Sequence, residues 1–140
     1  MHPDSPNDSL QGRSVVVIDD NDVVRKVLVD QLNRMGLRPV EAETAEQGLE
    51  ILDHTYLAGE PAPLVILDYH LPGASGAELA LTLKSRPQFR LSGLILYTGS
   101  ESLAEAAFLK EIGVAAVLRK PATASQIRSA LEQAAVPMRA

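Results

Sequence analysis

Acidic side chains directly follow two apolar stretches of this chain. Asp19 and Asp20 come after Val15-Val16-Val17-Ile18, and Asp68 comes after Leu64-Val65-Ile66-Leu67. Runs of four apolar residues are typical of strands buried on both faces of a parallel sheet. A carboxylate at the carboxyl end of such a strand lies where open α/β sheets bind ligands. We therefore expect Asp19, Asp20 and Asp68 to meet at one edge of a sheet.

Two further polar residues come at the ends of later apolar stretches. Thr98 follows Leu94-Ile95-Leu96-Tyr97, and Lys120 closely follows a shorter run from Val114 to Leu118. Parallel strands present their carboxyl ends at one edge, so both residues should join the acidic ones. Three carboxylates repel one another at low dielectric, but a divalent cation offsets that repulsion. Carboxylate, carbonyl and water ligands suit Mg²⁺.

This set of side chains predicts a particular chemistry. Lys120 supplies a fixed positive charge, and Thr98 with the Gly99 N–H supplies hydrogen-bond donors for a small dianion beside the metal. An Asp carboxylate can act as the nucleophile that accepts a phosphoryl group. Singly, each residue has an ordinary explanation, Asp68 and Thr98 as helix caps and Lys120 as part of a loop. Their joint occurrence favours metal-assisted phosphoryl transfer.

The elements that must position these residues alternate between strand and helix. Apolar patterns predict strands within residues 14–20, 38–42, 64–68, 92–98 and 114–118, and helices over 22–35, 44–57, 76–85, 101–112 and 123–135. Such alternation is typical of a parallel sheet with helices on both faces. We predict one doubly wound (βα)5, flavodoxin-like α/β domain over residues 14–135, with strand order 2-1-3-4-5. Pro39 favours an edge position for the second strand.

Helical spacing also predicts which residues face the core. The inward residues should be Val24, Val27, Leu28, Leu32 and Met35 in the first helix, and Ala45, Leu49, Leu52 and Tyr56 in the second. Tyr97 is interpreted as a core residue of its strand. The polar, proline-containing segment 1–13 is expected to be disordered, and residues 136–140 to form a tail.

The composition narrows the classes of function. The chain has 140 residues, a net charge of −5 and no cysteine, so disulfides and zinc–thiolate sites are excluded. The negative charge disfavours direct binding to nucleic acid or to an anionic membrane. No apolar run approaches the roughly 18 residues of a membrane span, and no signal-peptide pattern is present. We therefore expect a cytoplasmic protein.

The motifs at the predicted strand ends form a recognisable set. They are Asp19-Asp20, Asp68 with Leu71-Pro72-Gly73 and Gly76, Thr98, and Lys120-Pro121, with 30 residues from Asp68 to Thr98 and 22 from Thr98 to Lys120. From about Ser14 to Ala135 the chain therefore resembles the receiver domain of bacterial two-component response regulators. Asn21, with Arg25-Lys26-Val27-Leu28 after it, is also similar to receivers attached to hybrid histidine kinases.

The resemblance implies how the chain would act. Asp68 would accept a phosphoryl group from a histidine kinase or a histidine phosphotransfer protein, and the chain would not be a conventional enzyme. Lys120 would pair with Asp68 before transfer and with the phosphoryl group afterwards. Thr98 would hydrogen-bond a phosphoryl oxygen. The modification would switch protein–protein interactions.

The resemblance also implies a Mg²⁺ site. Asp20 and Asp68 would supply carboxylate ligands, His70 would supply its backbone carbonyl, and Asp19 would act largely through water. The His70 side chain would lie at the mouth of the pocket, where it would affect the access of water to the phosphoryl group. An exposed loop histidine without a role explains this residue equally well.

Two positions depart from the family pattern, and they concern the output rather than the site. Many receivers have an aromatic residue three positions before the lysine and a Phe after Lys-Pro. Here these positions hold Val117 and Ala122. The sequence therefore does not predict which downstream protein the domain would bind.

Three other functions compete with phosphoacceptance. A pseudo-receiver would bind proteins without phosphorylation, but it would need none of the acidic residues, Thr98 or Lys120. A phosphatase with an Asp nucleophile would want a second carboxylate two residues after Asp68, where this chain has His70. Dinucleotide binding is disfavoured because no Gly-x-Gly-x-x-Gly follows the first strand.

Overall fold

The chain folds into a central sheet with helices on its two faces. The computed structural model describes residues 10–71, 74–86, 89, 92–99, 107–108 and 110–135. The main strands are β1 (Ser14–Ile18), β2 (Arg38–Ala42), β3 (Leu64–Asp68), β6 (Leu94–Thr98) and β7 (Ala116–Arg119). The helices are α1 (Asp22–Arg34), α2 (Ala45–Leu57), α3 (Gly76–Ser85) and α5 (Ala124–Ala135).

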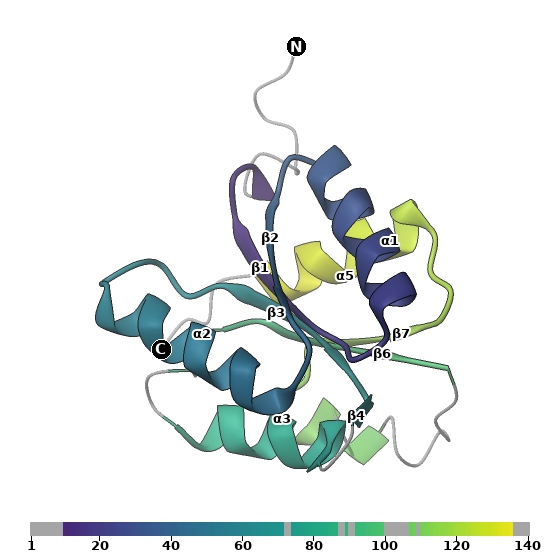
Figure 1. The fold of residues 1–140 in the computed structure, drawn as a ribbon. Coiled ribbons are helices and arrows are strands. Elements are labelled where there is room, and N and C mark those ends of the chain that lie inside the picture. The colour runs from purple at the N-terminus through teal and green to yellow at the C-terminus, as the bar shows by residue number, and fades with distance from the viewer. Residues whose placement is uncertain are drawn as a thin grey trace.

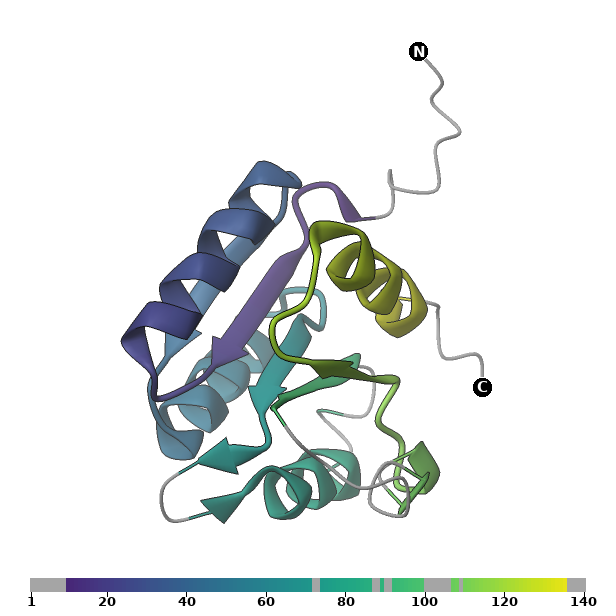
Figure 2. The same cartoon turned by 90° about the vertical axis from the view of Figure 1, so that its right-hand side faces the viewer.

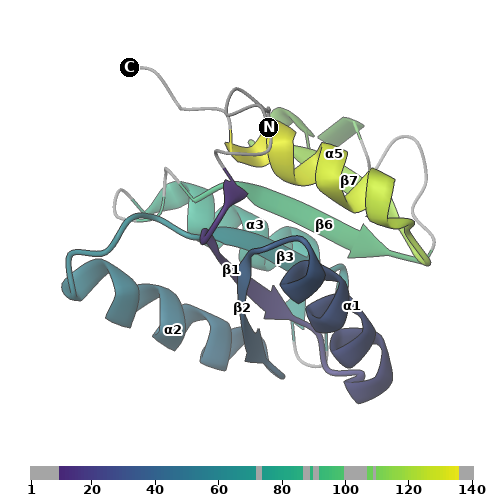
Figure 3. The same ribbon diagram turned by 90° about the horizontal axis from the view of Figure 1, so that it is seen from above.

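The five main strands form one parallel sheet in the order β2-β1-β3-β6-β7. Numbered along the chain, this is the predicted order 2-1-3-4-5, and β2 with its Pro39 lies at an edge. The strands twist relative to one another, as Figure 3 shows from above. Because all five run the same way, residues at their carboxyl ends share one edge of the sheet.

In the described part of the chain, α1 and α5 cover one face of the sheet, and α2 and α3 cover the other (Figure 1). Side chains alternate between the faces along each strand. Val15 and Val17 of β1 pack in one apolar cluster with residues of α1 and α5, among them Leu28, Leu32, Ile127 and Leu131. Val16 and Ile18 pack in the other with residues of α2 and α3, among them Leu52, Leu79 and Leu83. This two-sided burial confirms the predicted doubly wound architecture.

Glycine permits a close approach of α2 to β1. Gly48 is buried in α2, and a Cβ placed on it would overlap the side chain of Ile18 at the end of β1. Any larger residue would therefore force either the Ile18 side chain or α2 to shift.

The predicted inward faces of the first two helices are wrong at two positions. Val27 and Tyr56 are each 56% exposed. In α1 the buried set instead includes Arg25, whose charge is satisfied by specific partners described below. Leu52 is buried as predicted.

The packed part of the chain begins earlier than the predicted boundary at Ser14. Leu10 is only 1% exposed and belongs to the core cluster of α1 and α5. Residues 1–9, the predicted tail at 136–140 and most of the predicted helix at 101–112 lie outside the described residues.

A short antiparallel pair that the sequence did not predict follows the central strand. It consists of β4 (His70–Leu71) and β5 (Ala74–Ser75), and Figure 2 shows the two strands beside α3. Across the described part of the chain, no helix has the length and apolar character that a membrane crossing requires.

Candidate functional site

Three carboxylates meet at the carboxyl edge of the sheet, as predicted. Asp19 and Asp20 follow β1, and Asp68 ends β3, the strand next to β1. One oxygen from each lies within 4.8 Å of the others. Asp19 is 2% exposed and Asp68 7% exposed, whereas Asp20 is exposed to solvent. The cluster therefore has a buried side and an open side.

The Asp68 carboxylate is held through one of its oxygens. The backbone N–H of His70 donates to Oδ1 at 3.1 Å, and the Lys120 ammonium lies 3.3 Å from the same atom. Both of these contacts reach the same oxygen of Asp68. Burial raises the pKa of Asp68 and repulsion from Asp19 adds to this, while the His70 N–H and Lys120 oppose it.

Asp19 has a protein partner for each of its oxygens. Oδ1 accepts from the backbone N–H of Asn21 at 2.9 Å, and Oδ2 lies 3.4 Å from the Lys120 ammonium. The side chain of Asn21 in turn caps α1 by accepting from the Val24 N–H at 2.9 Å. The start of α1 thus fixes Asp19 in place and leaves Asp20 facing solvent.

Thr98 and Lys120 reach the same edge from β6 and from the end of β7. Thr98 is 1% exposed, and its backbone carbonyl accepts from the Lys120 N–H at 2.8 Å. The Lys120–Pro121 peptide bond is cis. Lys120 then extends its ammonium between Asp19 and Asp68.

For His70 the structure shows that its backbone N–H contacts Asp68. The role of its backbone carbonyl as a metal ligand stays a prediction.

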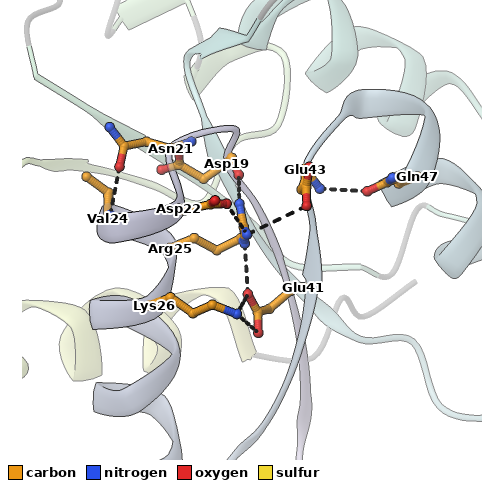
Figure 4. A network of polar contacts seen from close by, with 9 residues as sticks. All are labelled: Asp19, Asn21, Asp22, Val24, Arg25, Lys26, Glu41, Glu43 and Gln47. Carbon is orange, nitrogen blue, oxygen red and sulfur yellow. Dashed lines mark hydrogen bonds and ion pairs between the residues drawn. The ribbon is translucent and has the colours of Figure 1, made fainter.

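A buried arginine ties the acidic edge to the neighbouring strand and helix (Figure 4). Arg25 of α1 is 3% exposed. Its Nη1 donates to the backbone carbonyl of Asp19 at 2.7 Å, its Nε to Glu41 of β2 at 2.8 Å, and its Nη2 to Asp22 at 2.6 Å. Glu43 lies farther away, at 3.9 Å. The guanidinium fork therefore holds the end of β1 against β2.

The electrostatics of Arg25 and Glu41 follow from this contact. The hydrogen bond from Arg25, followed by that from Lys26, lowers the pKa of Glu41. The same bond to Glu41 raises the pKa of Arg25 against the opposing effect of burial. Sequence reasoning missed this buried role of Arg25. The available signal was its position, three residues before Leu28 and seven before Leu32, on the buried face of α1.

The amino-acid sequence is similar to those of known signalling and regulatory proteins. CheY1, a chemotaxis protein of Helicobacter pylori, is 28% identical over 119 residues, which are 84% of this chain and 93% of that protein. AruR, a transcriptional regulatory protein of Pseudomonas aeruginosa, is 38% identical over 85 residues, which are 61% of this chain. The match spans only 34% of AruR, so this chain corresponds to most of some relatives and about a third of others.

Solved structures agree with this relationship. A response regulator receiver domain protein from Clostridium thermocellum has a TM-score of 0.78 at 25% identity, over 88% of this chain and 94% of that one. The signal receiver domain of an HD domain-containing protein from Pseudomonas fluorescens has a TM-score of 0.73 at 26% identity, over 89% and 94%. The family model described as response regulator receiver domain matches residues 15–132. The chain therefore belongs to the response regulator receiver domain family of two-component systems.

Proposed function

We propose that this receiver accepts a phosphoryl group on Asp68 from a phosphohistidine, and that it acts in the cytoplasm as a switch rather than as a conventional enzyme. The observation that carries the proposal is the setting of Asp68. One of its oxygens is held by the His70 N–H and Lys120, and the carboxylate lies beside Asp19 and Asp20. A histidine kinase or a histidine phosphotransfer protein is the expected donor.

The donor atoms present fit Mg²⁺. Three carboxylates offer oxygen atoms within 4.8 Å of one another, and hard oxygen ligands are those that Mg²⁺ prefers. Asp20 and Asp68 would hold the ion with the His70 carbonyl, and Asp19, whose oxygens already have protein partners, would act through water. When bound, Mg²⁺ would offset the negative charge of the phosphoryl oxygens.

The transfer is a displacement at phosphorus. A carboxylate oxygen of Asp68 forms the new O–P bond as the P–N bond of the donor breaks, and the electron pair of that bond returns to the imidazole nitrogen. Lys120 lies 3.3 Å from Asp68 and offsets the charge of the transferred group. Thr98, at the end of β6, donates its hydroxyl hydrogen to a phosphoryl oxygen.

The proposal is tested by phosphorylation with acetyl phosphate and with a phosphorylated histidine kinase, each with and without Mg²⁺. We expect Mg²⁺-dependent labelling that is labile to alkali and hydroxylamine, because an aspartyl phosphate is a mixed anhydride. Asp68→Asn should abolish the label, while Asp30→Asn, an exposed carboxylate change on α1, should not. Acid-stable label in Asp68→Asn would point to a hydroxyl acceptor and overturn the proposal. A wild-type chain that takes no label from either donor would instead indicate a pseudo-receiver.

A further inference from the structure

Tyr97 contacts the site lysine through its ring and the following loop through its hydroxyl. It lies in β6 directly before Thr98, in register with Asp68 of β3 and Leu118 of β7. Its side chain is 6% exposed and belongs to the apolar cluster beneath α1 and α5. The prediction that Tyr97 is a core residue is therefore confirmed, but two contacts give it more than a packing role.

The first contact is between the aromatic ring and Lys120. The ammonium nitrogen lies 5.4 Å from the ring centroid, within the range of a cation–π interaction. The same nitrogen is 3.3 Å from Asp68 and 3.4 Å from Asp19. A lysine side chain is long and has many rotamers. The ring and the two carboxylates together restrict the ammonium to a place beside Asp68.

The second contact holds the loop that carries Lys120. The backbone N–H of Ala122 donates to the Tyr97 hydroxyl at 3.2 Å in a buried environment. The Lys120 N–H donates to the carbonyl of Thr98. Two successive residues of β6 therefore fix the two ends of the segment Lys120–Ala122. The alanine that departs from the family pattern after Lys-Pro is thus the partner of a tyrosine side chain.

We propose that Tyr97 is a positioning residue for Lys120, and that its ring speeds phosphoryl transfer by holding the ammonium against Asp68. The proposal rests on the function proposed above. The ring and the hydroxyl have separable effects. The ring acts on the reaction through Lys120, whereas the hydroxyl acts on stability by satisfying the buried N–H of Ala122.

Two substitutions separate these effects. Tyr97→Phe keeps the ring but loses the bond to Ala122, so the melting temperature should fall, while the rate constant at saturating acetyl phosphate and Mg²⁺ should fall less than in Tyr97→Leu. Tyr97→Leu removes the ring, and we expect a rate constant lower by about 3- to 10-fold at the same saturation. Tyr56→Leu, an exposed tyrosine change on α2, is the matched control and should alter neither quantity.

A double-mutant cycle separates positioning of Lys120 from general damage. In the Lys120→Ala background, Tyr97→Leu should cause little further loss of rate, because the group it positions is absent. An equal loss in both backgrounds, or an undiminished rate in Tyr97→Leu alone, would overturn the proposal.

A measurement on the unmodified protein avoids dependence on the folding of Tyr97→Leu. Nuclear Overhauser contacts between the Lys120 ε-methylene and the Tyr97 ring are expected in wild type and, with the phenyl ring, in Tyr97→Phe. Their absence in wild type would overturn the proposal directly. If wild type takes phosphate and Asp68→Asn does not, the proposed function stands whatever Tyr97 does. A wild type that takes none overturns both.

Discussion

The three carboxylates of the site differ in burial, and burial determines what each one contributes. Asp68 and Asp19 are taken out of water, and Lys120 lies between them. Asp20 remains exposed. Removing water from like charges is costly unless a cation compensates. Lys120 supplies one positive charge for three carboxylates, so the metal-free site keeps excess negative charge.

We expect Asp68→Asn to stabilise the metal-free protein at neutral pH. The pKa of Asp68 is raised above its ordinary 3.8, mainly by burial. The folded state therefore holds this proton more tightly than the unfolded state, so stability falls as pH rises through the folded pKa. Asparagine removes that loss, and Lys120 keeps Asp19 as a partner. The melting temperature of the variant should exceed that of wild type at neutral pH by about 2–5 °C and converge with it near pH 4. A difference in melting temperature that stays the same from neutral pH to pH 4 would contradict the prediction.

Mg²⁺ should raise the melting temperature of wild type but not that of Asp20→Asn. Ligand binding to the folded state alone stabilises it by mass action, by about 1.4 kcal/mol at ten times the dissociation constant. Asp22→Asn is the matched control, because Asp22 is exposed, contacts Arg25 and is not part of the carboxylate cluster. Its Mg²⁺-induced shift should equal that of wild type. The same shift in Asp20→Asn would exclude Asp20 as a ligand.

Residue types and spacing were enough to predict the cluster, but not its individual contacts. Asp19, Asp20 and Lys120 each follow a strand and Asp68 ends one, and parallel topology brings strand ends together. The bond from the His70 N–H to Asp68 depends on how the chain turns after β3, and no periodicity encodes that turn. The contact of Tyr97 with Lys120 likewise depends on side-chain direction at the edge of the sheet.

At the scale of elements, Arg25 joins α1, β2 and the end of β1. A buried guanidinium is tolerated here because its N–H groups meet a carbonyl and two carboxylates. Helical spacing predicted an apolar inward face and therefore placed Val27 inside. The structure exposes Val27 and buries Arg25, since specific hydrogen bonds override the apolar pattern at the helix start.

The pair of Arg25 and Glu41 should make stability depend on pH in the opposite sense to Asp68. The pKa of Glu41 is lowered from its ordinary 4.5, first by Arg25 and then by Lys26. Its contribution is therefore present above pH 4.5 and is lost as pH falls through the lowered pKa. Glu41→Gln should lower the free energy of unfolding by about 1 kcal/mol at neutral pH, because partial exposure weakens the ion pair. The difference from wild type should become smaller in acid.

Urea unfolding at several pH values measures this cost. Glu43→Gln is the control, because Glu43 lies 3.9 Å from Arg25 and is more exposed than Glu41. Its cost should be smaller at neutral pH. A Glu41→Gln cost that does not change with pH would show that the charge of Glu41 contributes nothing.

At the scale of the whole molecule, strand order and the two helical layers follow from the alternation of strand and helix patterns. A two-residue pair such as β4 and β5 is too short to leave a periodic signal, so the sequence could not predict it. The start of the packed region was misplaced for a different reason. A single apolar residue, Leu10, within a polar segment has no periodicity, yet it reaches the core.

The segment from Leu10 to Arg13 is fixed to the sheet by backbone hydrogen bonds as well as by burial. The Gly12 N–H donates to the Gly36 carbonyl at 2.8 Å, and the Arg38 N–H donates to the Arg13 carbonyl at 2.9 Å. Leu10 packs in the cluster that contains Leu32, Met35 and Leu37. The segment therefore closes the core beneath α1 at the end of the molecule away from the acidic site.

Leu10→Ala should consequently destabilise the whole domain by about 2–4 kcal/mol, because it removes buried methyl groups and leaves a cavity. The free energy of unfolding from urea denaturation measures the loss. Val23→Ala, at a position 73% exposed on α1, should change that free energy by no more than about 0.5 kcal/mol. Since Leu10 lies far from the acidic edge, the Mg²⁺-dependent labelling of Leu10→Ala should match wild type at temperatures where it is folded. A loss no larger than that of Val23→Ala would mean that the Leu10 side chain adds nothing to the stability of the fold.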